Sequence, residues 1–278
     1  MTRTLKITLA YEGTAYVGWQ RQAEGVSIQG LLEEALARLD GAPVAVRGAG
    51  RTDAGVHALG QVASARVATV HDPAVIRRAL NAMLPGDVRV LAVEEAPQSF
   101  HARYSATGKR YEYRIWQGPV QPPFVRAWSW HVPHPLDIAA MGRAARALEG
   151  THDFSAFQSA GSGVVSAVRT VAHARVERRG LPAGVAGGDE HEEGGGTGGH
   201  LVAVELEADG FLRHMVRAVV GTLVEVGEGR RPEASLPQLL ESRDRGASGP
   251  TAPAHGLVLV RVNYPPARGS APAAKPVS

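Results

Sequence analysis

The chain has 278 residues, of which 44% are hydrophobic and 21% are charged, and it contains no cysteine. This composition is typical of a globular protein with a buried core. It excludes disulfides, thiolate zinc sites, iron–sulfur clusters and cysteine nucleophiles. No apolar run approaches the roughly 18 residues that cross a bilayer. The N-terminus lacks the basic-then-apolar layout of a signal peptide, so we expect a cytoplasmic location and no membrane partner.

Arginine supplies most of the positive charge. The net charge is +3, and only Lys6, Lys109 and Lys275 among the 30 basic residues are lysine. Residues 181–200 hold four carboxylates and no lysine or arginine, so the rest of the chain carries a net charge of +7. A GC-rich genome would explain the arginine bias, and so would recognition of phosphates and base edges by the planar guanidinium.

Helical spacing of apolar residues predicts four helices in chain order. The first spans residues 27–40, Asp72-Pro73 begins a second that ends at residue 83, and Asp137 begins a third that ends at residue 150. The fourth runs from residue 210 to about 227. Alternating segments predict strands at residues 4–11, 43–47, 59–67, 88–94, 109–116, 165–176, 201–207 and 256–264. Short strands mixed with helices, without a regular βαβ period, indicate an α+β fold with mainly antiparallel sheets.

The order of these elements suggests two domains. Strand–helix–strand–strand–helix–strand occurs in the first hundred residues and loosely again in the second half, as in a duplicated architecture. We therefore expect an N-terminal domain of residues 1–105 and a C-terminal domain of residues 106–265. The glycine-rich, acidic residues 181–200 are predicted to form a flexible hairpin insertion, and residues 266–278 a disordered tail.

A polar, glycine-rich loop, residues 48–55, follows a predicted strand. A dinucleotide-binding loop would need glycine where Asp53 stands, and a carboxylate there would repel a pyrophosphate. The sequence also lacks the Gly-Lys-Ser/Thr of a Walker phosphate loop and the His-Glu-x-x-His pair of zinc proteases. The acidic cluster at residues 189–193 fits a solvated loop better than a metal site. We therefore expect no metal and no nucleotide or other cofactor.

Asp53 itself allows two interpretations. In the first it forms an Asx turn or caps a helix. In the second it is a functional carboxylate, kept ionised by an arginine such as Arg51, while the flanking glycines let a substrate approach the backbone. Residue chemistry alone leaves both open.

The segment Gly50-Arg-Thr-Asp-Ala-Gly-Val-His-Ala58 resembles the signature of the tRNA pseudouridine synthase A family. Residues 10–20, 100–113, 211–217 and 256–259 resemble further family segments, in family order. The resemblance spans residues 5–264, almost the whole chain. It implies a pseudouridine synthase fold: two similar α/β domains with mainly antiparallel sheets, flanked by helices, with a basic RNA-binding cleft.

The resemblance also implies roles for individual residues. Asp53 would be the catalytic carboxylate, Arg217 would pair with it, and Tyr111 would lie against the target base. Arg51 and Arg103 would contact the RNA. Leu257 would line the pocket for the uracil ring.

Residue patterns alone would assign several of these positions to structure. Tyr111 and Tyr113 alternate on one strand face, which is typical of core residues, and Arg217 lies at the edge of an apolar helix face, where a surface arginine is usual. His57 and His214 match the motifs but receive no catalytic role, since structural histidines are commoner.

The implied activity is isomerisation of uridine to pseudouridine in the anticodon stem-loop of tRNA, at positions 38, 39 and/or 40, by a homodimer. The reaction breaks the N1–C1′ bond and joins C5 to C1′ without gain or loss of atoms, which fits a sequence without cofactor motifs. Asp53 could attack C1′ or remove the C2′ proton. The alternative is a non-catalytic RNA-binding protein with the same basic cleft. A metal-dependent phosphodiesterase would need more carboxylate and histidine ligands near Asp53 than the sequence offers.

Overall fold

A computed structural model describes residues 2–159, 161, 165–180 and 199–266. The predicted insertion at 181–200 and the predicted tail at 266–278 lie almost entirely outside the described residues. The first half contains β1 (Arg3–Tyr11), α1 (Ile28–Asp40), β2 (Val46–Gly48), β3 (His57–Val67), α2 (Pro73–Met83) and β4 (Val88–Ala96). The strand–helix–strand–strand–helix–strand order predicted for this half is therefore confirmed.

The second half repeats this order with short elements added. It contains β5 (Gly108–Gln117), β6 (Trp130–Val132), α3 (Ile138–Arg146), β7 (Gly150–Asp153), the short helix η1 (Ser155–Phe157), β8 (Val168–Arg179), β9 (His200–Ala208), α4 (Met215–Gly227), α5 (Ser235–Ser242), the short helix η2 (Ala254–Gly256) and β10 (Leu257–Asn263). The loosely repeated order is carried by β5, α3, β8, β9, α4 and β10.

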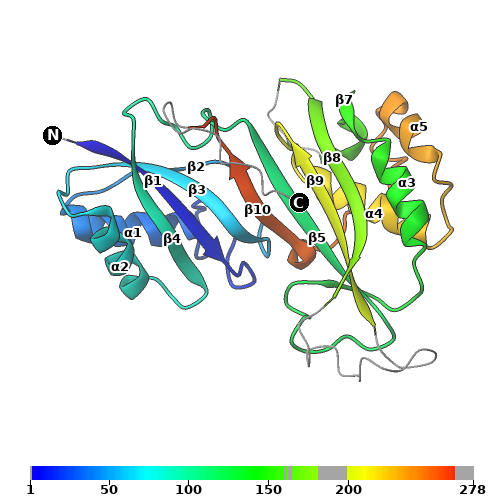
Figure 1. The fold of residues 1–278 in the computed structure, drawn as a ribbon, viewed down its shortest axis with the longest axis horizontal. Coiled ribbons are helices and arrows are strands. Elements are labelled where there is room, and N and C mark those ends of the chain that lie inside the picture. The colour runs from blue at the N-terminus through cyan, green and yellow to red at the C-terminus, as the bar shows by residue number, and fades with distance from the viewer. Residues whose placement is uncertain (1, 160, 162–164, 181–198, 267–278) are drawn as a thin grey trace, which may run out of the picture.

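The strands of both halves form one sheet, in the order β4-β1-β3-β10-β5-β9-β8-β7. Most pairs are antiparallel, and β10 pairs in parallel with β3 while pairing antiparallel with β5. The last strand of the chain thus joins the two halves. Helices α1 and α2 lie at one end of the sheet and α3, α4 and α5 at the other (Figure 1). The α+β fold with mainly antiparallel pairing is confirmed, whereas the domain boundary at residue 105 stays a prediction.

Three helices begin where their capping residues predict. Ser27 accepts a hydrogen bond from Gly30 N, Asp72 accepts one from Ala74 N, and Asp137 accepts one from Ala140 N. Each side-chain oxygen satisfies a backbone N–H that has no partner within the first helical turn.

Other predicted bounds were wrong, for local reasons. Helix α4 begins at Met215 rather than residue 210, because His214 has a left-handed backbone with φ 61°. Helix α3 ends at Arg146 rather than residue 150, where the chain tightens into i→i+3 turns before Gly150 at φ 104°. Strand β8 runs to Arg179 because its pairing with β9 continues beyond residue 176. Helix α5 was not predicted.

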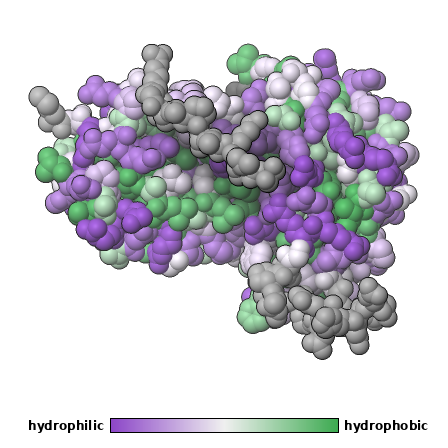
Figure 2. Space-filling model, viewed as in Figure 1, coloured by the Kyte–Doolittle hydropathy of each residue, from purple (hydrophilic) through white to green (hydrophobic). Residues whose placement is uncertain are grey.

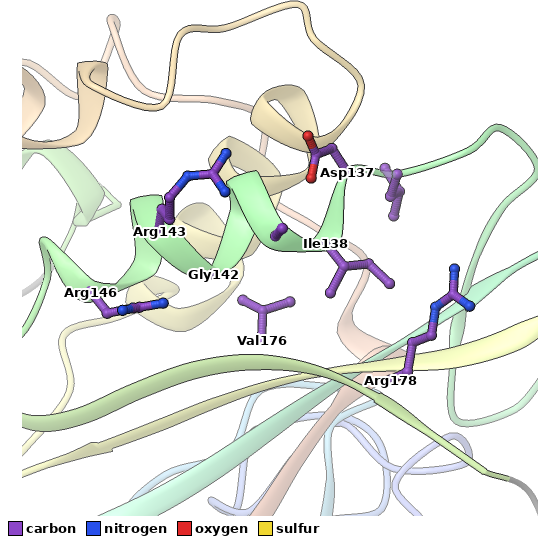
Figure 3. A pocket seen from close by; sticks show the side chains of 9 residues that line it. Asp137, Ile138, Gly142, Arg143, Arg146, Val176 and Arg178 are labelled. Atoms are coloured by element: carbon purple, nitrogen blue, oxygen red, sulfur yellow. The ribbon is translucent and has the colours of Figure 1, made fainter.

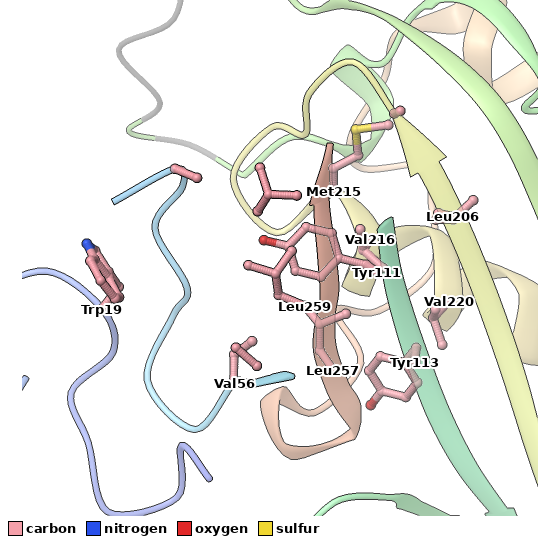
Figure 4. Packing of buried hydrophobic residues seen from close by; sticks show 14 of the residues in the cluster. Trp19, Val56, Tyr111, Tyr113, Leu206, Met215, Val216, Val220, Leu257 and Leu259 are labelled. Carbon is pink, nitrogen blue, oxygen red and sulfur yellow. The ribbon is translucent and has the colours of Figure 1, made fainter. Parts of the chain in front are cut away.

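The two faces of β5 have different partners. Tyr111 and Tyr113 pack with Val216 and Val220 of α4 and with Leu257 of β10 (Figure 4). The alternate residues of β5 carry charge and form ion pairs with residues of β5, β8 and β9: Arg110 with Glu205, Arg114 with Glu112, and Arg179 with both glutamates. Figure 2 shows hydrophilic side chains gathered over these strands. Of the predicted site residues, Tyr111 therefore lies on the face of β5 that packs against α4.

Candidate active site

The loop between β2 and β3 is held by hydrogen bonds from three directions. Trp19 N donates to Thr52 O over 3.0 Å, and the Thr52 hydroxyl lies 2.8 Å from Tyr11 Oη. From β3, the fully buried Gln61 donates through Nε2 to Gly50 O over 3.0 Å. Burial raises the pKa of Tyr11 to about 12, so its hydroxyl stays protonated in this network at neutral pH. These contacts fix the backbone that leads into Asp53.

Glycines in residues 12–20 let this segment approach the loop closely. Gly18 has φ 107°, and a Cβ there would lie 2.5 Å from Thr52 O. A Cβ on Gly13 would lie 2.1 Å from Val56 O. No other residue type fits without moving the loop backbone. The resemblance of residues 10–20 to the family therefore has a structural basis, which spacing alone did not reveal.

Two side chains contact the same carboxylate oxygen of Asp53. Oδ2 lies 3.5 Å from Arg217 Nη1 and 3.3 Å from His214 Nε2, and the side chain is 36% exposed. Within the described part of the chain, no hydrogen bond or ion pair involves Oδ1, and neither oxygen accepts a backbone N–H. An Asx turn or helix cap requires such a bond, so the structure favours the functional interpretation of this residue.

Arg217 is fixed by a second bond that points away from the carboxylate. Its Nε donates to Ala252 O over 2.7 Å, and Ala252 N donates back to Arg217 O over 3.1 Å. The side chain is only 16% exposed, so the usual surface arginine is the wrong interpretation here. The planar guanidinium therefore presents Nη1 to Asp53 in one orientation.

His214 belongs to the site, although sequence reasoning gave it no role. Its Nδ1 lies 2.8 Å from Ser159 Oγ, while Nε2 faces Asp53. Burial lowers the pKa of His214, and Asp53 opposes this effect while Arg217 adds to it. The available signal was its distance of three residues from Arg217, which places both side chains at one side of the start of α4.

Tyr111 lies at the border between core and cleft. Its ring is 7% exposed and packs edge-on against Phe211, with 5.1 Å between ring centroids. Burial raises the pKa of Tyr111 far above neutrality, and the nearby Asp53 carboxylate adds to this effect, so its hydroxyl stays protonated and can donate a hydrogen bond. Tyr113, in contrast, is a core residue whose hydroxyl donates to Pro253 O over 2.7 Å.

A cleft of about 1340 Å³ connects these groups. All six side chains expected to act lie along it: Arg51, Asp53, Arg103, Tyr111, Arg217 and Leu257. Its cationic lining is Arg21, Arg47, Arg51, Arg103, Lys109, Arg213 and Arg217. Asp53 is the single carboxylate among the described lining residues. The predicted basic cleft is therefore present, and Asp53 lies inside it.

A second hollow, of about 620 Å³, lies between α3 and β8 (Figure 3). Two of its polar groups have structural partners: Asp137 caps α3, and Arg143 binds Glu233. None of the predicted site residues lines it. Across the ranges that the structure describes, no three His, Asp or Glu side chains cluster as metal ligands, and no helix is long and apolar enough to cross a membrane.

His57, next to the loop that carries Asp53, is held as a neutral imidazole. Gly13 N donates to Nδ1 over 2.9 Å, so Nδ1 carries no proton, and Nε2 donates to His255 O over 3.0 Å. Burial lowers the pKa of His57 from its ordinary value of 6.5. The imidazole links Gly13 to His255 in η2 by hydrogen bonds and therefore has a structural role.

We expect acid to destabilise the protein through His57. Because its folded pKa is depressed, the unfolded chain binds the proton more readily, so stability is complete above about pH 6.5 and falls as the pH drops below it. His57→Gln keeps one acceptor and one donor without titrating. Its melting temperature should therefore fall less between pH 7.5 and pH 5.5 than that of the parent. Equal pH slopes in thermal unfolding would refute this assignment.

Comparison with known proteins identifies the family of this chain. The family model described as tRNA pseudouridine synthase matches residues 7–105 and 144–265. tRNA pseudouridine synthase A of Myxococcus xanthus is 46% identical over 267 residues, which cover 95% of this chain and 94% of that protein. The protein of the same name from Moorella thermoacetica is 45% identical over 94% of this chain and 99% of its own. tRNA pseudouridine synthase A 1 of Desulfotalea psychrophila is 43% identical over 94% of this chain and 100% of its own. The resemblance seen in the sequence is thus confirmed, and the chain belongs to the tRNA pseudouridine synthase A family of isomerases.

Proposed function

We propose that this isomerase converts uridine to pseudouridine in the anticodon stem-loop of tRNA, at positions 38, 39 and/or 40, with Asp53 as its catalytic carboxylate. One observation carries the proposal: Asp53 is the single described carboxylate in a cleft lined by seven cationic side chains. Such a lining suits the phosphates of an RNA strand. The names of the relatives, all tRNA pseudouridine synthases, support tRNA as the substrate.

The reaction needs one ionised carboxylate beside the sugar. Asp53 Oδ1 either attacks C1′ or removes the C2′ proton, and in both routes the N1–C1′ bond breaks and uracil leaves as a delocalised anion. The base then turns and C5 bonds to C1′. In the first route the Asp53–C1′ ester bond breaks in this step, and in the second route Asp53 returns its proton to C2′. C5 finally loses its proton, and N1 gains one. Because Arg217 and His214 both contact Oδ2, they orient the carboxylate without occupying Oδ1. A carboxylate stabilises positive charge at the anomeric carbon in glycosidases in the same way.

The target nucleotide has to leave its stack before Asp53 reaches the sugar. Flipping costs a few kcal/mol, which contacts at the edges of the cleft can offset. We assign Tyr111 and Leu257 to the uracil ring, because both lie beside Asp53 at the cleft wall. Exposed Arg51 and Arg103 are assigned to the RNA backbone. On the family resemblance, we also propose a homodimer of subunits that divide near residue 105.

Release of tritium from uracil C5 tests the proposed function directly. An unmodified tRNA transcript labelled at C5 is incubated with the protein in EDTA and without cofactor. We expect release to water, and none from a transcript whose uridines at positions 38–40 are replaced by cytidine. Tight tRNA binding without any release would instead support a non-catalytic RNA-binding protein. Release that is unaffected by the cytidine replacements would reject the proposed positions.

Tyr111→Phe separates the ring of Tyr111 from its hydroxyl. Phenylalanine keeps the edge-on contact with Phe211, but it removes a donor that is protonated at neutral pH. We expect kcat to fall about 10²-fold, the lower end for a positioned proton donor, with KM within threefold. Single-turnover tritium release measures this. Full activity of the variant would show that Tyr111 acts only through its ring.

A further inference from the structure

The loop between β4 and β5 places an exposed aromatic ring in the cleft. Tyr104 is 79% exposed and lines the same cleft as Asp53. Its loop is nevertheless anchored, because Ala102 N donates to Ser64 Oγ over 3.1 Å and Tyr264 Oη donates to Ala102 O over 2.6 Å. A large ring held in water on a fixed backbone needs a reason, since hydrophobic surface of this size is normally buried.

The ring of Tyr104 is ordered by its neighbours. The His101 ring lies 4.4 Å away between centroids at 37°, and the Arg103 guanidinium lies 5.8 Å from the Tyr104 centroid. His101 Nδ1 accepts from the backbone N of Arg103 and of Tyr104 over 3.1 Å and 3.3 Å, so the orientation of this imidazole is fixed. Together these groups form a ready platform on which a nucleobase can stack.

A second feature lies between this platform and the catalytic loop. The Lys109 side chain runs beside Gly50, with Nζ 3.4 Å from the place that a Gly50 Cβ would occupy. Among the residues with described structure, no carboxylate forms an ion pair with Lys109, whereas Lys6 is paired with Glu94 over 3.0 Å. Burial and the charges of Arg103 and Arg169 lower the pKa of Lys109. Positive charge is therefore concentrated beside Gly50, which lies three residues before Asp53 in the loop. Such a place suits a phosphate.

We propose that Tyr104 and Lys109 form a second nucleotide subsite in the cleft, where the Tyr104 ring stacks on an unpaired base and the Lys109 ammonium binds a backbone phosphate of the same RNA strand. Arg103 connects the two, because its guanidinium lies near the Tyr104 ring and its charge acts on Lys109. The subsite holds the strand next to the nucleotide being isomerised. It rests on the proposed function, since it requires RNA in the cleft.

Replacing Tyr104 by leucine and by phenylalanine tests the platform. Leucine keeps an apolar side chain but has no aromatic face, so KM for the tRNA transcript should rise about tenfold, with kcat within threefold. Phenylalanine should restore KM. Both variants should melt like the parent, because the side chain is exposed. An unchanged KM in Tyr104→Leu, or an equal rise in both variants, would overturn the platform.

Abasic substrates identify the base that stacks. Single nucleotides of the anticodon loop outside positions 38–40 are replaced by abasic sites, one at a time. At the position whose base stacks on Tyr104, the abasic site should lower the affinity of the parent enzyme about as much as Tyr104→Leu lowers affinity for intact RNA. The same abasic site should not lower the affinity of Tyr104→Leu any further. If the two losses add at every loop position, no base stacks on Tyr104 and the subsite is rejected.

Lys109→Met tests the phosphate contact, with Lys6→Met as a matched control outside the cleft. Binding of the transcript is measured with Asp53→Asn protein, which needs no turnover, at several salt concentrations. Loss of one phosphate contact should reduce the slope of log K against log salt by about one in Lys109→Met only. An unchanged slope would overturn the contact. Failure of tritium release by the parent protein would reject the proposed function, whereas an active parent with unaffected Tyr104 and Lys109 variants would reject only the subsite.

Discussion

Asp53→Asn should abolish tritium release, with a loss of at least about 10³-fold, while tRNA affinity stays within about threefold of the parent. Asparagine has the same shape, and the bonds that hold the loop come from the Thr52 and Gly50 backbone and from the Thr52 hydroxyl, none from the carboxylate. The change therefore removes charge and nucleophilicity and leaves the loop in place. Tritium release and filter binding of the same transcript measure the two effects.

A matched control is Asp244→Asn, an exposed aspartate outside the cleft that accepts from Gly246 N. Asparagine can accept that bond equally well, so activity and melting temperature should not change. Residual turnover of Asp53→Asn within tenfold of the parent would exclude Asp53 as the essential group. A fall in tRNA affinity as large as the fall in turnover would show that the carboxylate serves binding rather than chemistry.

Arg217→Lys should lower kcat about 10²-fold even though it keeps the positive charge. The arginine uses Nε on Ala252 O and Nη1 toward Asp53 Oδ2, and one lysine ammonium cannot serve both atoms. Small misplacements of a catalytic group are expected to cost about this much. Loss of the bond to Ala252 should also lower the free energy of unfolding by about 1 kcal/mol.

The control for this change is Arg38→Lys, an exposed arginine in the last turn of α1 and outside the cleft. Arg217→Met adds the loss of charge to the loss of geometry. A kcat for Arg217→Lys within threefold of the parent, together with a large loss in Arg217→Met, would show that charge alone matters. Equal losses in both variants would show that the fork geometry is decisive.

Local chemistry made much of the fold predictable. Ser27, Asp72 and Asp137 begin their helices because a capping oxygen acts within three residues of its own position. The alternation of Tyr111 and Tyr113 predicted one strand face correctly, since the side-chain period of a strand depends only on its own residues. Helix α5 was missed because its eight residues give too short a pattern to stand out.

The candidate site was predictable only in part. The motif around Asp53 was sufficient to identify the family, since it is a long local string, and the catalytic role of Asp53 stays a prediction. His214 was missed, because its distance of three residues from Arg217 is a weak signal. Its left-handed backbone and its contact with Ser159 have no signal near it in sequence. Tyr104 and Lys109 were equally invisible, because their significance comes from exposure and from the lack of an ion-pair partner.

The sequence by itself determined three helix starts, the strand faces, the excess of arginine and the family that the motif around Asp53 identifies. Only the tertiary structure decided which distant groups meet. Asp53 and Arg217 are 164 residues apart, and His57 and His255 are 198 apart. Both pairs meet where β10 inserts between β3 and β5. His255 lies directly before β10, and Arg217 is bonded to Ala252 in the segment that leads into this strand. Capping and side-chain alternation act over a few residues, whereas this pairing depends on the free energy of the whole sheet.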